Sequence, residues 1–154
     1  MNEHTITAET VDTLNDLIQT AKEGERDFRS CAENAHAEDL RHLLRRRSEE
    51  YRVAASELRW HLRRLGGTAA TKASMMAGPR RGWVASHSIM ASYTDQATLE
   101  VCERNEDAAL ERYADVLGRP LESAVKEVIQ AHRQGARRSH DKIRSLRDRM
   151  RVHA

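Results

Sequence analysis

The stretch that decides the fold spans residues 94–117 and reads TDQATLEVCERNEDAALERYADVL. Its apolar positions recur at alternating spacings of three and four residues: Leu99, Cys102, Ala109, Tyr113 and Val116. This spacing predicts an amphipathic helix with one face turned toward a core. Glu106 falls on that face and Glu103 lies one turn before it. A carboxylate on a buried face is costly unless it is paired, hydrogen-bonded or bound to a cation.

The composition of the whole chain favours long helices in a single domain, residues 1–154. Charged residues make up 32% and hydrophobic residues 39%, a balance typical of helical bundles, and aromatic residues only 4%. The chain has two prolines and seven glycines, and its β-branched residues form no alternating run. We therefore expect an all-α protein without a sheet.

Charge and hydropathy limit the classes of partner and location. A net charge of +2 is too small to indicate nucleic-acid binding, so no such partner is expected. No segment approaches the ~18 apolar residues of a membrane span, and the first residues lack the basic and apolar regions of a secretory signal. A cytoplasmic protein is expected. Cys31 and Cys102 have no metal-type spacing; reduced thiols suit that compartment, and a disulfide remains open.

The periodicity predicts four helices, over about 8–35, 37–65, 94–117 and 120–149. Thr7 is the expected N-cap of the first helix, Gly66-Gly67 a stop after the second, and Pro120 the first residue of the fourth. The connection 66–93 is long enough to cross the height of a bundle and is predicted to contain a short helix, roughly 83–92. One long central crossover is typical of a ferritin-like four-helix bundle.

Counting the helical rise from the two expected turns places several polar residues at one height. A turn near residue 36 sets Glu25 level with residues 47–50, and a turn near Gly118 sets Glu103 and Glu106 level with about residues 131–134. The predicted mid-bundle layer contains Glu25, Glu50, Glu103, Glu106 and His132, and His140 belongs to a second layer. These six residues are the candidate metal ligands, because carboxylates and imidazole from different helices hold di-iron or di-manganese centres.

A second interpretation of the same carboxylates needs no metal. Arg47 lies on the opposing apolar face of the second helix, and one guanidinium can satisfy two carboxylates. The glutamates would then form a buried ion-pair network.

Several short motifs together resemble a known family. LNDLI in the first helix, RRLGG at the end of the second, RGW in the crossover, CERNEDAALERY in the third and HDKIRSLRD in the fourth are similar to a bacterial family of uncharacterised ferritin-like four-helix bundles. The resemblance implies a ferritin-like fold and an association with stress, without an established activity.

The more distant relatives, rubrerythrin and bacterioferritin, imply a di-iron site. By that resemblance Glu25 stands for the glutamate of the first helix, and Glu103-x-x-Glu106 is similar to a glutamate pair of rubrerythrin. The two Glu-x-x-His motifs of that site are missing: Val53 follows Glu50 and Arg137 precedes His140 at the motif's offset.

Three functional hypotheses follow. The first is a non-catalytic or weakly metal-binding bundle protein with a buried Glu/Arg/His layer, acting through its surface or as a homo-oligomer. The second is an oxidoreductase or metal-storage protein that binds iron or manganese through the six candidate ligands. The third is a partner-binding module that reads acidic surfaces through arginine clusters such as residues 45–47.

Overall fold

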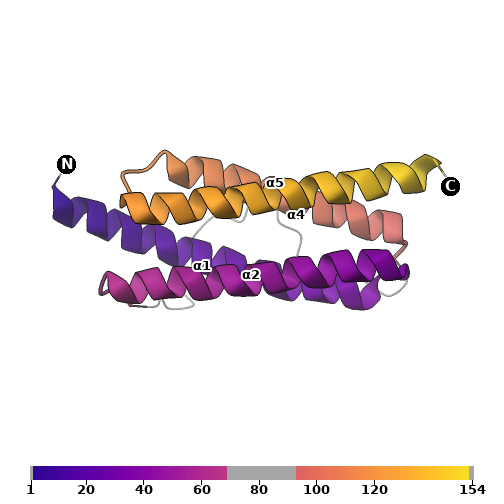
Figure 1. Cartoon of the computed structure of the whole chain (residues 1–154), viewed down its shortest axis with the longest axis horizontal. Coiled ribbons are helices and arrows are strands. Elements are labelled where there is room, and N and C mark those ends of the chain that lie inside the picture. Colours follow the sequence, from indigo (N-terminus) through magenta and orange to yellow (C-terminus); the bar gives the residue numbers. More distant parts are fainter. Residues whose placement is uncertain (1, 69–92, 153–154) are drawn as a thin grey trace.

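The computed structural model describes residues 2–68 and 93–152, which form four long helices (Figure 1). They are α1 (Glu3–Asn34), α2 (Glu38–Arg64), α4 (Asp95–Leu117) and α5 (Ser123–Val152). The all-α prediction is confirmed. The short helix expected near residues 83–92 lies outside the described residues.

The four helices form two antiparallel hairpins, α1 with α2 and α4 with α5. The hairpins lie side by side, and all four helices run along the long axis of the molecule (Figure 1). At one end, the Asp95 carboxylate accepts hydrogen bonds from the backbone N–H groups of His36 (2.7 Å) and Ala37 (2.8 Å). At the other end, Arg64 pairs with Glu122. The end of α2 and the start of α4 therefore lie at opposite ends of the bundle, as a long crossover between the two hairpins requires.

Two predicted helix starts are wrong. The N-cap of α1 is Asn2, whose side-chain oxygen accepts a hydrogen bond from the backbone N–H of Thr5 at 2.8 Å, whereas Thr7 lies inside the helix. The last helix begins at Ser123 instead of Pro120. The preceding turn is held on α1, because the backbone N–H of Glu122 donates to the Thr10 hydroxyl at 3.0 Å.

The predicted stop after α2 is confirmed. Gly66 has a φ of +74°, which only glycine adopts without strain, and the backbone N–H of Gly67 donates to the carbonyl of Leu62 at 2.9 Å.

Gly24 positions the central aromatic residue of the first hairpin. A Cβ at Gly24 would lie 2.7 Å from the ring atoms of Tyr51, so the ring occupies the space that any other side chain would need. The Tyr51 ring also stacks on Phe28, one turn further along α1, with a centroid distance of 5.6 Å. Tyr51 is therefore packed against two α1 residues one turn apart, with its hydroxyl directed toward Glu106 of the other hairpin.

No helix within the described residues is long and apolar enough to cross a membrane. Cys31 on α1 and Cys102 on α4 are free thiols and both are buried. Their contact, together with burial, raises the pKa of Cys102 well above its usual range, so this thiol stays protonated and packs as a small apolar group.

Candidate functional site

The centre of the bundle is occupied by one fully buried carboxylate, Glu106 of α4. Arg47 of α2 binds it through two nitrogens, Nε to Oε2 at 2.8 Å and Nη2 to Oε1 at 3.2 Å. The Tyr51 hydroxyl donates to Oε1 at 2.7 Å, and the Arg47 guanidinium lies 4.0 Å from the centre of the Tyr51 ring. The predicted pairing of Glu106 with Arg47 is confirmed. We call these three residues the buried triad.

The protonation of the buried triad follows from its surroundings. Burial lowers the pKa of Arg47, but its electrostatic interactions with Tyr51 and Glu106 raise this pKa by more, so the net change is upward and Arg47 stays a cation. Burial, reinforced by the charge of Glu106, raises the pKa of Tyr51 well above its usual range, so its hydroxyl keeps the proton it donates. Burial raises the pKa of the adjacent Tyr113 to about 12. A metal ion at Glu106 would have to displace the guanidinium.

The predicted single layer of ligands does not form. Glu25 pairs with Arg29 of its own helix at 2.7 Å, and Glu50 is half exposed, 3.6 Å from Nη1 of Arg47. The expected height of Glu25 is correct, since the hydroxyl of Ser48 donates to the Glu25 carbonyl at 2.6 Å. Its facing is wrong: Gly24 occupies the face toward α2, and the next residue is turned by about 100° around the helix.

For α4 and α5, by contrast, the expected relative heights along the bundle are wrong. His132 lies beside Tyr113, with ring centroids 6.5 Å apart, and its Nε2 contacts Glu57 at 2.9 Å. The residue opposite Glu103 is His140. The difference arises from the turn. Because α5 begins at Ser123, the hairpin turns beyond Gly118. Each residue by which the turn moves along the chain shifts the α5 residue opposite Glu103 by two.

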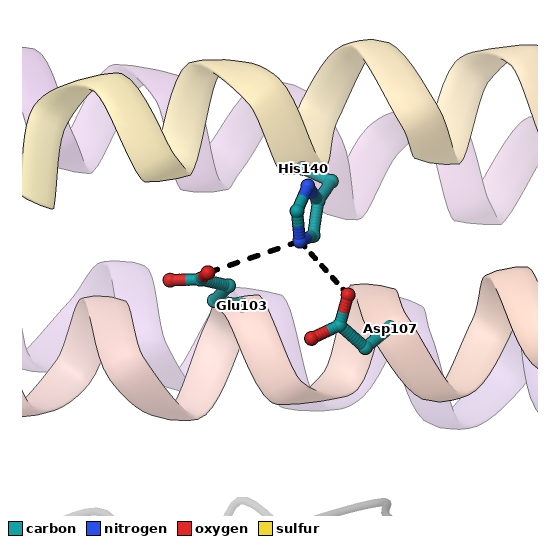
Figure 2. Close-up of side chains that lie close together, drawn as sticks. All are labelled: Glu103, Asp107 and His140. Atoms are coloured by element: carbon teal, nitrogen blue, oxygen red, sulfur yellow. Dashed lines mark ion pairs between the residues drawn. The ribbon is translucent and has the colours of Figure 1, made fainter.

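Glu103, Asp107 and His140 form a second cluster on the seam between α4 and α5, which we call the seam cluster (Figure 2). His140 Nε2 lies 2.8 Å from Oδ1 of Asp107 and 3.8 Å from Oε1 of Glu103. One ligand atom from each residue lies within 4.8 Å of the others.

Sequence reasoning missed Asp107. This residue follows Glu103 by one turn on the same side of α4, and its side chain is 60% exposed. Asp107 lies away from the apolar face of α4, and the signal that points to it is two acids four residues apart on one helix with a histidine on the next.

Around the seam cluster the charges are mixed. Arg147 pairs with the other oxygen of Glu103, and Asp141 lies 3.7 Å from Nδ1 of His140. Glu103 and His140 are largely buried, whereas Asp107 opens to solvent. The cluster is therefore rich in acceptors and accessible from one side.

Comparison with known proteins identifies the family. Residues 9–119 match the model of a family described as a domain of unknown function, DUF2383. The chain belongs to the DUF2383 family. No curated protein matches it.

A solved structure shares the architecture of this DUF2383 chain. It is a mutant of Dps1 from Mycobacterium smegmatis, with a TM-score of 0.78 over 96% of this chain and 99% of that one, at 12% sequence identity. At this identity the likeness shows the fold alone. The predicted ferritin-like four-helix bundle is confirmed.

The two clusters of this DUF2383 chain differ in what they can bind. Atoms about 2.0–2.2 Å from one metal ion are themselves roughly 3–4 Å apart. The distance from His140 Nε2 to Glu103 falls in that range, and the contact with Asp107 would need to open slightly. One nitrogen and two carboxylate oxygens suit iron(II), manganese(II) or zinc. The seam cluster brings together three groups that could hold a metal ion, whereas both oxygens of Glu106 already accept hydrogen bonds.

Proposed function

We propose that this protein is a non-catalytic ferritin-like bundle that binds one divalent metal ion, iron or manganese, at the seam cluster. The observation that carries the proposal is the convergence of Glu103, Asp107 and His140, from two helices, within 4.8 Å. The proposal divides the six candidate ligands from the sequence into two groups. Glu103 and His140 bind metal together with Asp107, and the other four candidates do not.

The balance of charge supports a cation at this position. The carboxylates of Glu103 and Asp107 face a single guanidinium, that of Arg147, which occupies only one oxygen of Glu103. A divalent ion would neutralise the remainder. Because Asp107 is exposed, water would complete the coordination, which makes binding weak and reversible compared with a fully enclosed site.

The buried triad argues against the alternative, a di-metal oxidoreductase or storage site inside the bundle. Such a site would need Glu106 as a ligand, yet Arg47 and Tyr51 hold both of its oxygens. Removing Arg47 from a buried carboxylate costs about 3–5 kcal/mol before any metal contact forms. A homo-oligomeric state, a cytoplasmic location and a stress association stay predictions from the sequence.

The test is a calorimetric titration of the full chain with Mn²⁺, and with Fe²⁺ under anaerobic conditions, after chelator treatment. We expect one saturable site. His140→Ala should weaken metal binding at least about tenfold. Losing a residue that only hydrogen-bonds to a metal ligand already costs about tenfold or more in affinity, so losing a ligand itself should cost no less. His42→Ala is the matched control, because His42 is exposed on α2 and pairs only loosely with Glu38 at 3.9 Å. Equal affinity of the His140 variant and the wild type would contradict the proposal.

A further inference from the structure

A small pocket opens between the two hairpins, beside the buried triad and away from the seam cluster. Its volume is about 140 Å³, and its walls come from α2, α4 and α5. The space exists because three positions that face it carry almost no side chain: Ala54, Ala131 and Gly135. None of these positions was a candidate from the sequence.

Two guanidinium groups meet at this pocket. A Cβ placed on Gly135 would lie 3.8 Å from Nη1 of Arg47 and 3.8 Å from Nη2 of Arg138. Nε and Nη2 of Arg47 donate to Glu106. The remaining nitrogen, Nη1, lies on the side of the pocket, 3.6 Å from the half-exposed Glu50. Within residues 2–68 and 93–152, Arg138 forms no hydrogen bond or ion pair. Converging guanidinium groups with spare donors are typical of sites for oxyanions.

His132 adds an acceptor to these donors. Its Nε2 faces the Glu57 carboxylate at 2.9 Å, and a carboxylate can only accept, so in the neutral ring the proton belongs on Nε2. Nδ1 is then a lone-pair acceptor. It is buried and has no hydrogen-bond partner in the described part of the chain, and the side chain lines the pocket. An orphaned buried acceptor is costly and indicates a missing donor.

We propose that this pocket binds a small protonated oxyanion, with the size and chemistry of bicarbonate or hydrogen phosphate. Its charged oxygens accept from Nη1 of Arg47 and from Arg138, and its O–H donates to Nδ1 of His132. The volume admits an ion of this size and excludes a nucleotide. The site shares no residue with the seam cluster and does not depend on metal binding there.

The experiment is an NMR titration of the ¹⁵N-labelled full chain, with sodium phosphate in one arm and sodium bicarbonate in the other, each at constant pH and ionic strength. The amide of Gly135 reports on the pocket. We expect a saturable shift with a dissociation constant of about 1 mM or below in at least one arm. The arm that saturates identifies the anion.

Matched variants separate the pocket from general attraction of anions to a basic surface. Arg138→Gln removes one donor and should weaken binding roughly tenfold or more, the loss of one charged hydrogen bond. Arg137→Gln, the exposed neighbour that does not line the pocket, should change it less than about twofold. Ala131→Leu fills the space without changing charge and should abolish the shift.

Two outcomes would overturn the proposal: no saturable shift at Gly135 in either arm, or equal losses in the Arg137 and Arg138 variants. Arg137 and Arg138 are both exposed, so we expect both variants to fold like the wild type. Titration of the same samples with Mn²⁺ shows independently whether the seam cluster binds metal.

Discussion

Glu103 and Glu106 lie one turn apart on α4, yet they belong to opposite environments. Glu106 is fully buried, and Arg47 and Tyr51 satisfy both of its oxygens. Glu103 lies on the seam beside an imidazole and a second carboxylate, that of Asp107, which is open to water. Position around the helix, rather than residue type, makes the first carboxylate part of the core and the second a candidate ligand.

Removing one member of the buried triad should have the largest effect on stability. Arg47→Met should leave Glu106 as an unpaired charge in the core and lower the free energy of unfolding by about 3–5 kcal/mol. Urea denaturation measures the effect. The double variant Arg47→Met/Glu106→Leu should recover most of the loss, because replacing both charges by apolar groups is often neutral or stabilising. A single variant that costs under about 1 kcal/mol would show that water reaches Glu106.

A backbone substitution tests whether Tyr51 is held as described. Gly24→Ala places a Cβ 2.7 Å from the Tyr51 ring and should cost about 1–3 kcal/mol by overpacking. Gly135→Ala is the control, since its nearest neighbours lie at 3.8 Å, and it should be neutral or stabilise the helix by up to about 1 kcal/mol. If thermal unfolding shows equal effects, the packing of Tyr51 on Gly24 does not position the buried triad.

The pH dependence of stability tests His132, which borders the buried triad. Burial lowers its pKa below the ordinary value of about 6.5, although the hydrogen bond and charge of Glu57 oppose this shift. The unfolded chain therefore binds the proton more readily than the folded chain. This contribution to stability is complete above about pH 6.5 and is lost as the pH falls through the window below it.

His132→Gln should flatten the decline of the melting temperature between about pH 8 and pH 5. Identical pH profiles for the variant and the wild type would show that the His132 pKa is the same in the folded and unfolded chains.

The smallest change in stability is expected on the seam. Asp107→Asn alters an exposed side chain, so the free energy of unfolding should change by less than about 0.5 kcal/mol, while Mn²⁺ affinity falls. Urea denaturation and metal titration on the same preparation check both parts. A large loss of stability with unchanged metal affinity would assign Asp107 to the fold instead of the site.

Much of the fold could be predicted because its signals are local. Three-four spacing gave the helices, Gly66 marked the end of α2, and the length of residues 66–93 indicated a crossover. The helix starts were missed where a distant contact decides: residues 118–122 stay out of α5 because the turn is held on Thr10 of α1.

The candidate site was harder to predict because it depends on rotation and register. Glu106 on the apolar stripe and Arg47 opposite it gave the ion pair directly. Glu25 was misplaced by a single residue around the helix, because the pattern does not show that Tyr51 takes the place beside Gly24. His140 lies opposite Glu103 because the turn lies further along the chain than expected, and Asp107 is an exposed residue away from the apolar face.

The central claim is that metal binds on the seam and that the buried triad replaces metal inside the bundle. The most direct test is the Mn²⁺ stoichiometry of three chains after equilibrium dialysis: the wild type, His140→Ala and the double variant Arg47→Met/Glu106→Leu. At a Mn²⁺ concentration that just saturates the wild type, we expect one ion in the wild type, one in the double variant and well under one in the His140 variant. Metal retained by the His140 variant and lost from the double variant, or no metal in the wild type, would contradict this claim.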